Sequence, residues 1–357
     1  MRRMDSNLIL IFSFWIATFV VWFLLIPSFI KFLIDFKLGK QIRSNATIWK
    51  ATIFEQLHKK KTWTPTMWGA IILITVFLMV FISMILQAFD VVKYSLFNQK
   101  ETYLSLFTLL TVWWLGLIDD ILNIKWIGKT KWLSARVKML WLTFFATLWA
   151  LWFYYKLWWN VVDEAGNFLR TLNNPFWMDL ELWIFFIPLF IFIILATSNS
   201  VNVTDGLDWL AWWLLLFCYG IYTYITFDQW MYLLSTLCIS IVWALLAFLW
   251  FNVKPAKFYM WDVWSLALWA NLWIMAMITN TVFILIIVWA IFIFETLSVI
   301  IQLTSKKLRN GKKVFLVAPF HHHLEALGWS EENVVFRLWL VGIISSVFWI
   351  IFYILQK

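Results

Sequence analysis

Two adjacent carboxylates at the end of an apolar run are the first candidates for chemistry in this chain. Segment 113–120 reads WWLGLIDD and ends in Asp119 and Asp120. Neighbouring residues of a helix point about 100° apart, so both side chains can reach one wet cavity. Carboxylate oxygens are also the ligands that magnesium prefers, together with water and phosphate oxygens. The pair indicates either a magnesium site or an acidic helix end that is exposed to water.

A second polar segment reads SNSVNVTDGLD, over residues 198–208. Its amide and acid side chains recur at every third residue, as Asn199, Asn202, Asp205 and Asp208. On an α-helix, neighbouring members of such a series share a face. Gly206 can break the helix and open its backbone to a ligand. The segment fits a polar pocket, and the alternative is a short connecting turn that is rich in capping residues.

Two further segments have side chains that could bind a metal ion or a phosphate. In FNVKPAKFYMWDVWS (251–265), Pro255 prevents helix continuation. Asp262 then stands either as the N-cap of the next helix or as a metal ligand. In KKKTWTPTMWG (59–69), lysines precede Thr-Pro-Thr, which fits either a phosphate-facing loop or an ordinary cytoplasmic charge signal.

Three consecutive histidines, His321, His322 and His323, lie in the stretch VAPFHHHLEALGW. They cannot all face one point on a regular element, so we expect one or two to reach a ligand while the rest orient the loop. A zinc site would need further ligands at suitable spacing, and no Cys lies near. Donation to a phosphate is the more natural role for these side chains.

Membrane helices must position these groups. Hydrophobic residues make up 64% of the 357 and charged residues 13%, with a mean hydropathy of +0.83. This composition excludes a soluble globular enzyme, a disordered protein and a collagen-like fibre. The only two cysteines, Cys218 and Cys238, cannot build a disulfide framework. Apolar runs fall near 8–34, 67–89, 102–118, 139–159, 182–198, 209–226, 230–251, 264–279, 281–303 and 338–355. We predict an all-α integral membrane protein with about ten transmembrane helices, as a single domain over 1–357.

The basic residues gather on one predicted face of this bundle. They lie mainly in segments 37–61, 119–138, 252–263 and 304–337. The positive-inside rule makes that face cytoplasmic and puts both termini outside. The acids that fall at helix ends on the same face are Asp119, Asp120, Asp205, Asp208 and Asp262. An active site at the cytoplasmic face is therefore predicted. Because the net charge of +9 resides in these loops, membrane lipid is the expected partner and nucleic acid is not.

Seven short stretches occur in the order in which one family has them. They are TPTM at 64–67, IDD at 118–120, LSAR at 133–136, NVTDGLD at 202–208, FNVKPA at 251–256, ETLSVIIQ at 295–302 and APFHHHLE at 318–325. Together they resemble the phospho-N-acetylmuramoyl-pentapeptide transferases, within the polyprenyl-phosphate N-acetylhexosamine-1-phosphate transferases (glycosyltransferase family 4). APFHHHLE is the specific stretch, whereas the Asp pair alone is weak evidence.

The resemblance implies a magnesium-dependent enzyme of the bacterial inner membrane. Such an enzyme transfers phospho-N-acetylmuramoyl-pentapeptide from UDP-N-acetylmuramoyl-pentapeptide to undecaprenyl phosphate, giving lipid I and UMP in peptidoglycan synthesis. Two anionic phosphates must approach each other, so positive charge has to offset their repulsion. A site at the cytoplasmic helix ends also gives the lipid access from the bilayer and the nucleotide access from the cytosol.

The same resemblance implies roles for individual residues. The magnesium ligands would be Asp262, as the main one, with Asp119, Asp120 and Asp205. Catalytic roles would fall to Asp119, Asp120, Asp205, His321 and His322. Substrate binding would fall to Lys61, Thr64, Asn199, Asn202, Asp208, Asn252 and His323.

Two other functions fit part of the pattern. A sibling transferase would use another UDP-amino sugar, although those enzymes have a different histidine-containing loop. A transporter would use the carboxylates as a proton relay. Inverted repeats would favour the transporter, and the sequence has no evident internal repeat. The resemblance leaves a monomer and a homodimer both open.

Tryptophan stands where the family pattern has glycine. The chain has 30 Trp and only 10 Gly. The affected positions are 63, 68, 209, 261, 264 and 269, whereas Trp329 and Trp339 match family tryptophans. Bulky rings at those six positions would crowd the metal site and the helix contacts, which keeps an inactive relative as a third alternative. Because some bacterial lineages read the codon UGA as glycine, we predict that these six tryptophans are glycines in the natural protein.

Overall fold

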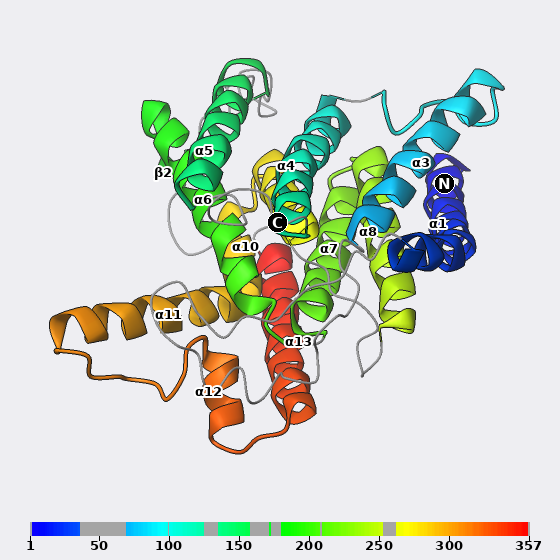
Figure 1. Ribbon diagram of the computed structural model, residues 1–357. Coiled ribbons are helices and arrows are strands. Elements are labelled where there is room, and N and C mark those ends of the chain that lie inside the picture. The colour runs from blue at the N-terminus through cyan, green and yellow to red at the C-terminus, as the bar shows by residue number, and fades with distance from the viewer. Residues whose placement is uncertain are drawn as a thin grey trace.

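The computed structural model is a bundle of helices, drawn in Figure 1. It describes residues 2–35, 69–98, 100–124, 135–157, 171–172, 180–207, 209–252 and 262–355. The long α-helices are α1 (Arg2–Asp35), α3 (Gly69–Ala88), α4 (Lys100–Ile124), α5 (Ala135–Trp152), α6 (Phe186–Thr204), α7 (Leu210–Asp228), α8 (Tyr232–Phe251), α9 (Asp262–Ile278), α11 (Ala290–Leu308) and α13 (Glu331–Leu355). The short ones are α10 (Val282–Val288), α12 (Phe320–Ala326), the π-turn η2 (Phe153–Leu157) and the 3-10 turn η4 (Trp183–Phe185).

Within the described residues, the apolar runs that the sequence predicts are helical, so the helical architecture is confirmed. The run 281–303 is divided between α10 and α11. One small exception is an antiparallel pair of two-residue strands, β1 (Thr171–Leu172) and β2 (Leu180–Glu181). Hydrophobic periodicity did not predict it, because two residues are too few to show an alternation.

Seven of the described helices are long and apolar enough to cross a membrane, namely α1, α3, α4, α5, α7, α8 and α13. An eighth candidate is the pair of α10 and α11, which is bent by 73°. Two shorter apolar stretches are Phe186–Ser198 in α6 and Leu266–Ile278 in α9. The polar end of α6, which carries Asn199 and Asn202, shortens its apolar part. The molecule is thus a multi-pass membrane protein, while the number ten and the outside termini stay predictions.

The helices differ in how much of their surface other helices cover. In the most apolar 18-residue window of the α8 span, 78% of the residues are buried, against 22% in that of the α13 span. The α13 span presents large exposed apolar side chains such as Phe348 and Leu355. Contiguous exposed apolar surface suits a hydrocarbon surrounding, where such side chains incur no hydration cost. α8 therefore belongs to the centre of the bundle and α13 to its perimeter.

The packing brings the motif-bearing segments to one end. α4 packs against α9, and α6 packs against both α9 and α11. Figure 1 shows α11 lying across the direction of α13 and extending outward, after which the chain returns through α12. α12 in turn contacts α11 and α13. The histidine helix α12 is therefore held between two long helices.

Candidate active site

The carboxylate pair of α4 is buried near the end of that helix. Asp119 is 3% exposed and Asp120 is 0% exposed, so these acids are not a solvated helix end. The Nζ of Lys138, in the first turn of α5, lies 2.6 Å from Asp119 Oδ2. Since a buried charge without a partner is strongly destabilising, the contact with Lys138 compensates the burial of Asp119. The ion pair also ties α4 to α5.

Lys138 is a functional candidate that the sequence reasoning missed. The loop charges entered that reasoning only as topology signals, and Lys138 was one of them. A usable signal was its place inside the first turn of an apolar helix, where a lysine needs a polar partner. The buried acid at Asp119 is that partner.

Asp205 and Gly206 form the C-terminal end of α6. Asp205 is the C-cap, and its backbone N–H donates to the carbonyl of Val201 at 2.9 Å. A Cβ added to Gly206 would collide with His321 Nε2 and would lie 3.1 Å from His322 Nε2. The absence of a side chain at 206 is what lets both imidazoles approach this backbone. The sequence predicted that Gly206 opens the backbone to a ligand; in the structure its close neighbours are the two histidines, and contact with a ligand stays a prediction.

His321 and His322 each pair with a glutamate through Nδ1. His321 Nδ1 lies 3.0 Å from Glu295 Oε2, and both side chains are fully buried. His322 Nδ1 lies 2.6 Å from Glu325 Oε2, one turn along α12. The two imidazole rings are 4.2 Å apart at 63°, so they present their Nε2 atoms side by side toward Gly206. Neither glutamate was predicted as a site residue, although Glu295 and Glu325 lie inside the ETLSVIIQ and APFHHHLE stretches.

His323 has a different environment from its two neighbours. Its Nδ1 accepts a hydrogen bond from the backbone N–H of Leu316 at 3.2 Å, and its ring contacts those of Phe315 and Phe320. This matches the expectation that some of the three histidines orient the loop. Its assignment to substrate binding stays a prediction.

Asn252 caps the end of α8 and is buried. Its backbone carbonyl accepts a hydrogen bond from the indole Nε1 of Trp209, which lies in the turn that precedes α7. Trp209 therefore fills space beside a residue that the sequence assigns to substrate binding.

Several predicted site residues fall outside the described part of the chain. Lys61, Thr64 and Asp208 lie outside it entirely, and so do the side chains of Asn199, Asn202 and Asp262, although their backbones belong to α6 and α9. Among the described residues, no group of three or more His, Cys, Asp or Glu is arranged to hold a metal ion. The magnesium ligand set stays a prediction, and its chemistry fits, because two adjacent buried carboxylates supply hard oxygen donors.

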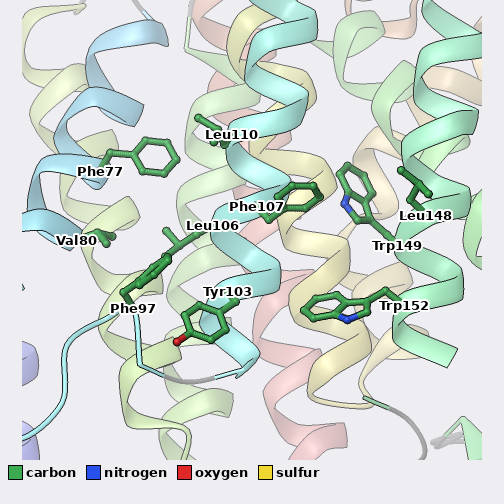
Figure 2. Close-up of a pocket in the computed structure, with 10 residues that line it drawn as sticks. All are labelled: Phe77, Val80, Phe97, Tyr103, Leu106, Phe107, Leu110, Leu148, Trp149 and Trp152. Atoms are coloured by element: carbon green, nitrogen blue, oxygen red, sulfur yellow. The ribbon is translucent and has the colours of Figure 1, made fainter. Parts of the chain in front are cut away.

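An apolar pocket of about 680 Å³ lies between α3, α4 and α5. Figure 2 shows its lining of aromatic and aliphatic side chains, with the two indole rings of Trp149 and Trp152 on the α5 side. On α4 its residues run from Tyr103 to Leu110, which is roughly 14 Å or more along the helix from Asp119. Such a lining has no charged group for a phosphate, so this pocket does not hold the reacting phosphates.

Comparison with known proteins identifies the family. The profile of glycosyl transferase family 4 matches residues 102–280, a stretch that contains the α4 carboxylates, Asp205 and Asp262. The chain belongs to glycosyl transferase family 4. The histidine helix lies beyond the matched stretch but within the region that full-length members share with this chain.

Relatives within the family align over nearly their whole length. A protein of Geobacillus sp. (strain WCH70) is 34% identical over 93% of this chain and 94% of its own. One from Anoxybacillus flavithermus is 32% identical, over 92% and 93% respectively, and one from Listeria monocytogenes serotype 4b is 33% identical, over 93% and 96%. All three are named phospho-N-acetylmuramoyl-pentapeptide-transferase.

Proposed function

We propose that this chain transfers phospho-N-acetylmuramoyl-pentapeptide from UDP-N-acetylmuramoyl-pentapeptide to undecaprenyl phosphate, releasing UMP and forming lipid I. The observation that carries the proposal is the full-length similarity to relatives of that name, which includes the histidine helix as well as the α4 carboxylates. A fold that buries acids and two imidazoles near helix ends, with a half-buried lysine beside one of the acids, supports the same chemistry.

The protein's own residues have distinct parts in this reaction. Asp119, held by Lys138, positions the lipid phosphate from the α4 side. His321 and His322 present Nε2 atoms at the end of α6, where each suits a hydrogen bond to a phosphate or sugar oxygen. Positive charge from Lys138 offsets part of the repulsion between the two phosphates.

Magnesium is the proposed cofactor, held by Asp262 with Asp119, Asp120 and Asp205. When bound, the ion supplies positive charge that stabilises UMP as the leaving group. The proposed site faces the cytoplasm of a bacterial inner membrane, with both termini outside. The distribution of loop charges supports this orientation.

The decisive assay measures UMP release by the purified protein in detergent. We expect release with UDP-N-acetylmuramoyl-pentapeptide, magnesium and undecaprenyl phosphate, and none without the lipid. Equal or faster release from UDP-N-acetylglucosamine would support a sibling transferase instead. A protein that releases no UMP from either nucleotide would be a transporter or an inactive relative, and the proposal would be wrong.

A charge change at Asp262 tests the metal assignment. Asp262→Asn keeps the shape of the side chain but removes its charge, so we expect UMP release to fall more than about a hundredfold, the effect of losing about 3 kcal/mol of transition-state stabilisation. Asp228→Asn is the matched control, because Asp228 accepts a hydrogen bond from Tyr353 at the far end of α7. Near-normal UMP release by Asp262→Asn would show that the metal assignment is wrong, and would leave the family assignment intact.

A further inference from the structure

Glu295 is a carboxylate in an apolar part of α11 and is fully buried. Burying a charged group there is costly unless strong partners compensate for lost hydration. Its Oε2 atom receives two contacts from one residue, His321. The backbone N–H of His321 donates to Oε2 at 3.2 Å, and the ring Nδ1 lies 3.0 Å from the same oxygen. Both the place and the orientation of the imidazole are therefore fixed by one glutamate.

The same contact sets which ring nitrogen faces the site. A carboxylate oxygen accepts hydrogen bonds, so Nδ1 carries the proton that points at Glu295. Nε2 is then the nitrogen of His321 that points away from Glu295. Among the described residues it has no hydrogen-bond partner, although it is buried. It packs against Gly206, beside Nε2 of His322.

We propose that Glu295 is a positioning residue, which holds His321 with Nδ1–H toward itself and Nε2 toward the substrate phosphate at the Asp205–Gly206 end of α6. A buried carboxylate that fixes the orientation of an imidazole is a recurrent device at sites that handle charge. This inference rests on the proposed function, because the phosphate is that of the transferase reaction.

Substitution of Glu295 tests the proposal through kinetics. Glu295→Gln keeps the size of the side chain but removes its charge, so kcat for UMP release should fall about ten- to a hundredfold, as is typical when a supporting hydrogen-bond partner is lost. KM for the nucleotide should change by less than about threefold, because Glu295 acts on an orientation rather than on the bulk of the binding surface. Ser305→Ala is the structural control: it removes another hydrogen bond from α11, that of Ser305 Oγ to the carbonyl of Lys312 in the connection between α11 and α12. It should keep kcat.

Coupling to His321 separates positioning from mere folding. If Glu295 acts through His321, adding Glu295→Gln to His321→Asn should cost less than about threefold beyond the single variant. Independent, multiplying losses in the double variant would overturn the proposal. A wild-type protein that releases no UMP would instead mean that the proposed function had failed.

A spectroscopic measurement on the wild type needs no variant kinetics. The chain has four histidines, so ¹⁵N-histidine labelling of the protein in bilayers gives few imidazole signals, and His321→Asn identifies one of them. The His321 signal should show a protonated Nδ1. A His321 whose Nδ1 is bare and whose Nε2 alone carries the proton would contradict the proposal, even if Glu295→Gln failed to fold.

Discussion

Gly206 and Trp209 stand three residues apart in the connection between α6 and α7, and they differ in how well residue type fits the backbone. At Gly206, the missing side chain is needed, because a Cβ there would meet both imidazoles. At Trp209, the backbone has φ 75°, a left-handed conformation that bulky residues rarely adopt. The largest side chain thus occupies a position whose backbone favours glycine.

The difference between these two positions indicates that the turn at 209 suits glycine better than the tryptophan found there. A left-handed conformation costs a residue with a Cβ about 1–2 kcal/mol, and glycine escapes that cost. Trp269 is a second tryptophan that fits its surroundings poorly. It is fully buried in α9, and its indole Nε1 has no partner within the described residues. The indole Nε1 of Trp339, which matches a family tryptophan, has no partner there either, so the backbone conformation at 209 is the stronger evidence.

The largest expected effect is that of filling the space at 206. Gly206→Ala should lower UMP release more than about a hundredfold, because a shift of about 1 Å in reacting groups has effects of this size. His321 cannot move aside freely, since Glu295 holds its ring. Gly220→Ala in α7 is the control, because nothing lies within 4 Å of a Cβ there. Normal UMP release by Gly206→Ala would show that the close approach of the histidines has no part in catalysis.

Replacing Trp209 tests the other half of the comparison. Trp209→Gly should cost less stability than removing a comparable ring from a regular helix, because relief of the left-handed backbone offsets part of the lost packing. It should not lower UMP release, because it clears space beside Asn252. Trp339→Gly is the matched control, since that ring packs against Trp209 from a regular helix. It should destabilise the protein, through a lost aromatic side chain and a glycine in a helix. Equal destabilisation by both variants would refute the idea.

The gene tests the same idea without any protein chemistry. We expect UGA codons at positions 63, 68, 209, 261, 264 and 269, and UGG at 329 and 339. The structure supports a genuine tryptophan at 329, where the Arg337 guanidinium lies 4.1 Å from the ring centroid. UGG throughout would defeat the glycine reading and would make an inactive relative the serious alternative.

The sequence predicted the helices well and the contacts between them poorly. Apolar runs define membrane helices because lipid requires long apolar segments with satisfied backbones, so within the described residues the runs are helical. The pairings Lys138–Asp119 and Glu295–His321 join residues 19 and 26 positions apart, from different helices. No local pattern reports such distances, which depend on how the helices pack. Local patterns therefore predicted the helices. The site residues that the sequence did not reveal are those whose partners are remote in the chain.

The end of α7 has a further tryptophan with a left-handed backbone, which the sequence did not reveal. α7 ends in a Schellman motif: the N–H of Trp230 donates to the Phe227 carbonyl at 3.0 Å and the N–H of Met231 to the Thr226 carbonyl at 2.8 Å. Trp230 is left-handed, with φ 65°. The corresponding residues at the ends of α3, α9 and α12 are Asp90, Asn280 and Gly328, the types that tolerate this conformation.

The smallest expected effect is therefore at Trp230. Its side chain is 72% exposed, so Trp230→Gly loses little packing and should stabilise the protein by about 1 kcal/mol in thermal unfolding, with no change in UMP release. Trp230→Ala separates the two causes, because it removes the ring but keeps the Cβ that makes φ 65° costly. Its stability should stay near that of the written sequence. Asn280→Gly should gain only a few tenths of a kcal/mol, since Asn already tolerates the conformation. If Ala stabilises position 230 as much as Gly does, the exposed ring and not the backbone is the source of the strain, and the case for glycine at 230 fails.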